Sequence, residues 1–288
     1  MLKRKKLLVI GLITAMTLTV ALSGCGDNTQ TEGSNGELSG TVVIAGSTSV
    51  QPLSEELAEA FMDKNKNVSV EVQGGGSGQG IKAIEQAIAD FGALSREVKE
   101  EEKAEVKTET IIAKDGVAVV VNPECTVKDL TLDQIQKIYT GEIKNWKEVG
   151  GEDAEIVVVT REEGSGTRGA FTEITKVLSK DEAGKEIDNT IAQAIVQPST
   201  GAVKQTVATT PNSIGYVSLG SLDDTVKAVS VEGVAPSSDT VVDGSYKISR
   251  PFIYVTGAEL SEAAQAYVDF VMSEEGQAIV AEEFIPVK

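Results

Sequence analysis

Apolar and polar residues follow two regular patterns in the part of the chain that begins near residue 40. Apolar positions alternate over 41–45 and 68–72, which predicts strands, and they recur every three or four positions after each strand, which predicts helices. The helical positions are Leu53, Leu57 and Phe61 within 50–63, then Ile81, Ile84 and Ile88. Two strand-helix pairs in succession predict a parallel sheet.

The rest of the chain continues this alternation in a second block. We expect strands at 110–113, 116–121, 155–159, 214–219, 227–231 and 252–255, with a turn-rich stretch at 233–244. We expect helices around Leu132, Ile135, Ile138 and Tyr139, around Phe171, Ile174, Val177 and Leu178, and over 261–272. This order predicts two α/β lobes, with the chain crossing near 114–120 and returning between 226 and 250. We assign 39–115 and 245–288 to lobe 1 and 116–244 to lobe 2.

The N-terminus reads as an export signal. Four basic residues at 3–6 precede an uncharged apolar run over 7–20, which is short for a membrane span. The segment Leu22-Ser23-Gly24-Cys25 resembles a bacterial lipobox, and this resemblance implies cleavage after residue 24 and a lipid on Cys25. An uncleaved N-terminal anchor is the alternative. The polar stretch 25–38 reads as a flexible tether.

Composition excludes several classes of protein. The full chain has 26 Lys and Arg against 44 Asp and Glu, and a net charge of −18. Such a surface repels nucleic acid. The chain has no histidine, which removes the usual general base and the commonest transition-metal ligand, so we expect no catalysis, no metal and no cofactor. Cys125 is the one cysteine besides Cys25, and we expect it to be a free, partly buried thiol.

Three loops rich in serine, threonine and glycine each follow a predicted strand and begin a predicted helix. They are 46–49, 74–80 and 164–167, the last with Arg161 just before it. A helix N-terminus presents unpaired N–H groups and the positive end of the helix dipole. In open α/β sheets ligands lie beyond the carboxyl ends of the strands, so loops from both lobes would converge on an oxyanion in a cleft between them.

Six segments in register resemble the phosphate-binding lipoproteins of bacterial phosphate ABC transporters, the PstS family. They are 45–53, 75–82, 91–97, 138–146, 160–168 and 214–217, and the match runs from about residue 40 to the C-terminus. The resemblance implies a two-lobe periplasmic-binding-protein fold of type II. It further implies a protein, which we expect to be a monomer, held at the extracytoplasmic face of the cell membrane. That protein captures inorganic phosphate for the transporter's permease subunits and their cytoplasmic ATPase.

The resemblance also assigns binding residues. It places phosphate on hydroxyl groups and backbone N–H groups of the three loops, with a charge-assisted contact from Arg161, whose guanidinium Glu163 orients. In enteric relatives an aspartate that follows a Phe-Gly-Ala-Ser stretch accepts the proton of phosphate. Here the stretch reads Phe91-Gly92-Ala93-Leu94 and is followed by Ser95 and Arg96. Asp90 and Glu97 are the candidate acceptors. The predicted binding residues are Ser47, Thr48, Ser49, Ser77, Ser95, Arg96, Arg161, Ser165, Gly166 and Thr167.

Several alternative readings stay open. Each hydroxyl residue taken alone is more often a plain helix N-cap, and each arginine more often forms a surface ion pair. We expect Tyr139, Trp146 and Tyr216 to be packing residues, and the acidic run 97–109 to be a solvated helix face. The same fold could bind molybdate, tungstate or sulfate. Residues 78–83 also satisfy a G-x-G-x-x-A fingerprint, which leaves a nucleotide-dependent enzyme as a remote possibility.

Overall fold

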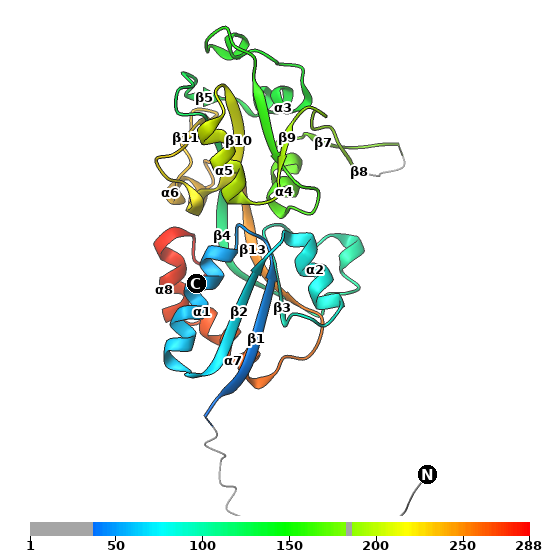
Figure 1. Ribbon diagram of the computed structural model, residues 1–288, viewed down its shortest axis with the longest axis vertical. Coiled ribbons are helices and arrows are strands. Elements are labelled where there is room, and N and C mark those ends of the chain that lie inside the picture. Colours follow the sequence, from blue (N-terminus) through cyan, green and yellow to red (C-terminus); the bar gives the residue numbers. More distant parts are fainter. Residues whose placement is uncertain (1–36, 183–185) are drawn as a thin grey trace, which may run out of the picture. The chain divides into compact units, whose positions relative to one another are not determined.

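The computed structural model describes residues 37–182 and 186–288 (Figure 1). The predicted export signal, Cys25 and nearly all of the predicted tether lie outside these residues. The first elements alternate as the pattern predicts: β1 (Ser39–Gly46), α1 (Gln51–Lys64), β2 (Asn67–Gly74) and α2 (Ser77–Glu85). The next strand, β3 (Phe91–Leu94), was not predicted. They are followed by η1 (Glu100–Glu102) and the long strand β4 (Thr108–Val121).

The second block has more short elements than the sequence predicted. It comprises β5 (Asp129–Leu130), α3 (Leu132–Thr140), η2 (Trp146–Val149), β6 (Val157–Arg161), α4 (Gly166–Ile174), β7 (Leu178–Lys180), β8 (Glu186–Asp188), β9 (Ile195–Gln197), α5 (Thr200–Thr209), β10 (Ser213–Ser218), η3 (Leu219–Ser221), β11 (Lys227–Ala228), β12 (Ser230–Val231) and α6 (Ser238–Val242). The chain ends with β13 (Ser249–Thr256), α7 (Glu262–Val271) and α8 (Glu274–Glu283).

The first lobe is built on a sheet in the order β2-β1-β3-β13-β4, and it comprises these strands with α1, α2, α7 and α8. Strands β2, β1 and β3 are parallel, and β13 is antiparallel to both of its neighbours. Because side chains alternate across a strand, Phe91 and Ala93 face the core beneath α1 and α7, whereas Leu94 joins Ile81 and Ile84 of α2 on the other face. Figure 1 shows α1, α7 and α8 gathered on one side of this sheet and α2 on the other.

The second lobe uses the far half of β4. Residues 117–121 of that strand pair with β10, and the order continues through β6 to β9, with β10, β6 and β9 parallel. Helices α3 and α4 cover one face, where Tyr139, Phe171 and Tyr216 form an aromatic cluster. Helix α5 covers the other face through Val203 and Val207. Sequence and structure thus agree on two α/β lobes. The prediction of mostly parallel sheets was wrong, because β4 and β13 pair antiparallel with their neighbours and make the sheet of each lobe mixed.

Strands β4 and β13 connect the two lobes. The two strands pair antiparallel, and at the point where they pass from one lobe to the other Asp115 lies opposite Arg250. Arg250 donates from Nε and Nη2 to Asp115 Oδ2 at 3.1 and 2.9 Å. Both side chains are almost fully buried, with exposed fractions of 0% and 1%. The second Asp115 oxygen accepts the Leu219 amide at 3.1 Å. A buried ion pair therefore lies at the point where the chain passes between lobes.

Several predicted elements needed correction. The strands expected at 110–113 and 116–121 are one continuous strand, and the turn-rich stretch contains the short helix α6. Ile88 lies beyond the end of α2 and is 65% exposed, so it is not part of that helix's buried face. Val177 and Leu178 both lie beyond the end of α4, and Leu178 belongs to β7. Helices α5 and α8 and strands β3, β5 and β7 to β9 were not predicted.

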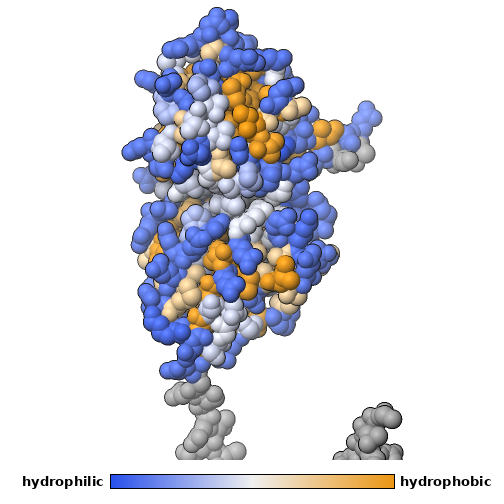
Figure 2. All heavy atoms as spheres, in the orientation of Figure 1, coloured by the Kyte–Doolittle hydropathy of each residue, from blue (hydrophilic) through white to orange (hydrophobic). Residues whose placement is uncertain are grey.

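The visible surface of the described chain is mostly hydrophilic. Figure 2 shows hydrophilic residues over most of the visible face, with apolar groups in small separate areas. Cys125 is a free thiol, as expected, but it is buried rather than partly buried, and burial raises its pKa. Within the described ranges, no helix combines the length and the apolar character that a membrane crossing requires.

Candidate functional site

The carboxyl ends of the parallel strands of both lobes carry a cluster of buried hydroxyl groups. We define the hydroxyl cluster as Ser47, Thr48, Ser49, Ser77, Ser95, Thr167 and Thr200. Six of them are almost fully buried and Thr48 is partly buried. They follow β1, β2, β3, β6 and β9, as the rule for open α/β sheets predicts. Polar groups are buried at this density only where they are hydrogen-bonded.

Ser95 connects the first two predicted loops. Ser47 Oγ donates to Ser95 Oγ at 2.8 Å, and the Ser95 amide donates to Ser77 Oγ at 3.1 Å. Hydroxyls of the first loop also reach the other lobe, where Ser49 Oγ lies 2.9 Å from Thr167 Oγ1. The structure thus brings together the predicted hydroxyl residues of all three loops.

These hydroxyls are not ordinary helix caps in the first two loops. Helices α1 and α2 have no side-chain hydrogen bond at their N-caps, which are Val50 and Gly76. Ser77 is instead the first residue of its helix, so its N–H is among those that helix geometry leaves without an intrahelical acceptor. The third loop differs, because Ser165 caps α4 by accepting the Arg168 amide at 3.2 Å. Of the predicted hydroxyl residues, Ser165 therefore uses its side chain in a cap.

Gly166, the first residue of α4, allows the lobes to approach closely. A Cβ at this position would lie 2.1 Å from Ser77 Oγ and 2.7 Å from Ser95 Oγ, both in the first lobe. Gly78 lies in the same contact, since its amide donates to the Gly164 carbonyl at 3.0 Å. The G-x-G-x-x-A fingerprint that begins at Gly78 is therefore part of the packing between lobes.

Arg161 brings a positive charge to the hydroxyl cluster. It ends β6, and its side chain is 2% exposed. Nη2 donates to Thr48 Oγ1 at 3.1 Å and Nη1 donates to Thr200 Oγ1 at 3.2 Å. Its own amide donates to the Tyr216 hydroxyl at 3.2 Å, and burial raises the pKa of Tyr216 to about 12. Tyr216 stays neutral and packs in the core, as predicted, and it also fixes the backbone of Arg161.

The carboxylate that orients Arg161 is Glu162, so the prediction of Glu163 was wrong. Glu162 accepts from Nε and from Nη2, both at 2.8 Å, in a bidentate pair. Glu163 is exposed. The chain turns directly after β6, so the alternation that would have placed Glu163 on the same side as Arg161 does not extend beyond the strand.

Arg96 does not donate a hydrogen bond to the cluster. Its guanidinium pairs with both oxygens of Glu102 at 2.6 and 2.7 Å and with the Glu97 carbonyl at 2.9 Å. Burial would raise the pKa of Glu102, but hydrogen bonds from Arg96 and the Lys99 amide outweigh it and hold that pKa below its usual value. The prediction that Arg96 binds the anion is therefore not supported. The reading of 97–109 as only a solvated face was also wrong at Glu102.

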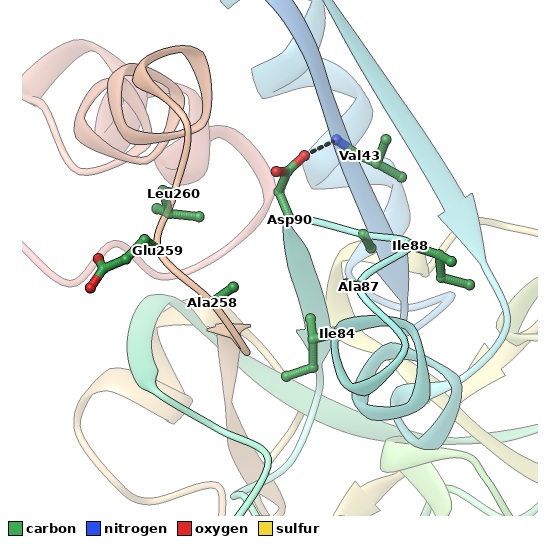
Figure 3. Close-up of a pocket in the computed structure, with 9 residues that line it drawn as sticks. Val43, Ile84, Ala87, Ile88, Asp90, Ala258, Glu259 and Leu260 are labelled. Carbon is green, nitrogen blue, oxygen red and sulfur yellow. Dashed lines mark hydrogen bonds between the residues drawn. The ribbon is translucent and has the colours of Figure 1, made fainter.

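Neither candidate proton acceptor lies at the cluster. Asp90 accepts the Val43 amide at 2.8 Å beside a pocket at the amino end of β3 (Figure 3). Five residues of extended chain, about 16 Å, separate it from Ser95. Glu97 is exposed. Within residues 37–182 and 186–288, no carboxylate is hydrogen-bonded to the hydroxyl cluster. The same residues contain no group of acidic or cysteine side chains that could hold a metal ion.

Thr200 is a cluster residue that the sequence reasoning missed. It is the first residue of α5, which had not been predicted as a helix. The available signal was Ser199, a favoured N-cap residue, followed by Val203 and Val207 at helical spacing. The site thus contains the start of a fourth helix.

Comparisons with known proteins match this architecture. Residues 31–275 match a family model described as a PBP superfamily domain. The phosphate-binding protein PstS of Bacillus subtilis is 35% identical over 299 residues, covering 99% of this chain and 95% of that protein.

Two solved structures are also similar to this chain in sequence and fold. One from Clostridium perfringens, assigned as a phosphate ABC transporter substrate-binding protein with bound phosphate, is 45% identical. It has a TM-score of 0.81 and covers 86% of this chain and 100% of its own. An ABC-type phosphate transport receptor from Vibrio cholerae is 34% identical, with a TM-score of 0.70, and covers 85% of this chain and 99% of its own.

These matches confirm the two-lobe binding-protein fold and the predicted family. Because this is a family of solute-binding proteins, the matches also confirm the prediction that the chain is not an enzyme. They remove the alternative of a nucleotide-dependent enzyme. The chain belongs to the PBP superfamily and, within it, to the family of PstS phosphate-binding proteins.

Proposed function

We propose that this chain captures inorganic phosphate outside the cytoplasm and delivers it to the permease of an ABC importer. The observation that carries the proposal is the hydroxyl cluster with one buried guanidinium, at the carboxyl ends of strands from both lobes. The relatives named above are phosphate-binding and phosphate-transport proteins, which supports phosphate as the ligand.

The chemistry of the cluster suits a dehydrated phosphate. An anion removed from water must regain its hydrogen bonds from the protein. Hydroxyls can donate hydrogen bonds to phosphate oxygens and can also accept a hydrogen bond from a protonated phosphate oxygen. Arg161 adds charge-assisted donors, while its pairing with Glu162 leaves the local charge close to balanced. We assign binding to the predicted residues Ser47, Thr48, Ser49, Ser77, Ser95, Arg161, Gly166 and Thr167, with the Ser165 cap holding the start of α4.

We propose that binding is coupled to closure of the two lobes. Contacts between lobes carry this step: Thr48 with Arg161, Ser49 with Thr167, and the Gly78 amide with the Gly164 carbonyl. Bending at the crossing strands β4 and β13 would separate these groups and admit the anion. The lobe limits that we propose are 39–115 with 245–288, and 116–244.

We further propose that a lipid on Cys25 anchors the mature protein to the outer face of the membrane as a monomer. The basic and apolar stretches before Cys25 and the lipobox-like segment 22–25 support the anchor. Loss of residues 1–24 removes four positive charges and no negative ones, so the mature chain would carry a net charge of −22. Phosphatidylglycerol-containing vesicles should retain the acylated form and not a Cys25→Ser form.

One observation favours a second candidate ligand. With no carboxylate hydrogen-bonded to the hydroxyl cluster in the described ranges, the site has no dedicated acceptor for the proton that distinguishes phosphate from sulfate. A fully deprotonated tetrahedral oxyanion, such as sulfate, molybdate or tungstate, is therefore the alternative.

Titration calorimetry at pH 7 tests both candidates. Phosphate should bind with micromolar affinity or better, about −8 kcal/mol, as capture for transport requires. Absence of heat and of a melting shift with millimolar phosphate contradicts the proposal. Tighter binding of sulfate, molybdate or tungstate than of phosphate favours the alternative.

A further inference from the structure

Thr200 occupies an unusual place among the residues around Arg161. It begins α5, whose N-cap is Ser199, and Ser199 Oγ already accepts the Ala202 amide at 3.1 Å. The Thr200 hydroxyl is therefore not needed to cap its own helix. The residue is only 4% exposed, so its hydroxyl requires partners within the protein.

Those partners are three residues of the proposed phosphate site. Thr200 Oγ1 accepts from Arg161 Nη1 at 3.2 Å and lies 2.9 Å from Ser49 Oγ. The Thr200 amide donates to Thr48 Oγ1 at 3.3 Å. Thr48 and Ser49 belong to the first lobe, whereas Arg161 and Thr200 belong to the second. Thr200 thus joins the Arg161 guanidinium to the loop 46–49 of the opposite lobe.

The hydrogen bonds of the guanidinium show what Thr200 adds. Glu162 holds Nε and Nη2, and Thr48 accepts a further hydrogen bond from Nη2. Thr200 accepts from Nη1, the guanidinium nitrogen that Glu162 and Thr48 do not contact. Since a planar guanidinium is fixed when its different nitrogens are held, Thr200 and Glu162 together set the plane of Arg161.

We propose that Thr200 is a positioning residue for the anion site. It holds Arg161 in the orientation required for a charge-assisted contact and links that group to the first loop when the lobes close. This inference rests on the proposed function, because its effect is measured as phosphate affinity. Holding a binding group in place before the ligand arrives reduces the ordering cost of binding.

The test compares two substitutions at Thr200 with one elsewhere. Thr200→Val keeps the shape and removes the hydroxyl, whereas Thr200→Ser keeps the hydroxyl. Thr172→Val is the matched control, because Thr172 is also buried in the second lobe but its hydroxyl donates only to the Arg168 and Gly169 carbonyls of its own helix. Titration calorimetry with phosphate is run on all three variants and on the unmodified protein, together with thermal melting.

We expect Thr200→Val to weaken phosphate binding at least tenfold, or about 1.4 kcal/mol. Thr200→Ser and Thr172→Val should stay within about threefold of the unmodified protein. A smaller loss for Thr200→Val, or a larger loss for Thr200→Ser, overturns the inference. If Thr200→Val does not fold, Thr200→Ala replaces it under the same criteria. Failure of the unmodified protein to bind phosphate would instead refute the proposed function, so the two failures are distinguishable.

Discussion

Replacement of Arg161 by Ala removes the guanidinium that, among the arginines of residues 37–182 and 186–288, donates to the hydroxyl cluster. Glu162 holds the Nε and Nη2 edge, so Nη1 and the remaining Nη2 hydrogen are the donors that an anion can share with Thr48 and Thr200. Two hydrogen bonds from a charged donor contribute about 1.5–3 kcal/mol each, or about 3–6 kcal/mol together. The loss in phosphate affinity should therefore be at least about a hundredfold.

The same change leaves Glu162 without its partner beside an incoming anion, which adds repulsion to the lost contacts. Titration calorimetry on Arg161→Ala measures the total effect. Arg96→Ala is the informative comparison, because Arg96 is also paired with a carboxylate but hydrogen-bonds to Glu102 and not to the cluster. It should lower stability and change phosphate affinity by less than about threefold. Equal losses of affinity in the two variants would refute the assignment of the binding charge to Arg161.

Three further predictions follow from particular contacts. Gly166→Ala should weaken phosphate binding, measured by calorimetry, because the new Cβ would collide with Ser77 and Ser95. Gly164→Ala should leave binding unchanged, because the space around its Cβ is open. Equal effects of the two substitutions would contradict this explanation. Asp115→Ala should lower the free energy of unfolding in denaturant titrations by about 3–5 kcal/mol, because it leaves Arg250 buried without its partner; a loss below about 1 kcal/mol would show that the pair contributes little. The pKa of Glu102 is lowered in the folded protein, so its pairing stabilises the fold above its ordinary pKa of 4.5 and this contribution is lost as pH falls through the lowered value. Glu102→Gln should reduce stability at pH 7 and flatten that acid dependence, and an unchanged pH profile would contradict the assignment.

Local patterns predicted the first two strand-helix pairs of the first lobe and the three glycine-rich loops well. Strong alternation in β1 and β2 and the buried face of α1 are properties of short segments, and the loops carry their own helix-start signals. Helix α5 escaped prediction because only Thr200, Val203 and Val207 of its ten residues are buried. Helix α8 has a similarly weak pattern, with Gly276, Gln277 and Val280 buried.

The partners of charged residues could not be predicted from sequence spacing. Glu162 and Glu163 are adjacent, and which of them reaches Arg161 depends on the turn that ends β6. Arg96 and Glu102 meet because η1 folds back toward the end of β3. The Asp115 and Arg250 pair depends on the register of two strands 135 residues apart in sequence. These contacts arise from tertiary structure, which short-range patterns do not contain.

The most direct test of the central claim is a phosphate assay on ligand released from the purified, denatured protein. The protein should be purified in phosphate-free buffer, with Arg161→Ala treated in parallel. We expect close to one phosphate per molecule of the unmodified protein and far less from the variant. Release of another oxyanion in its place, or equal phosphate from both proteins, would contradict it.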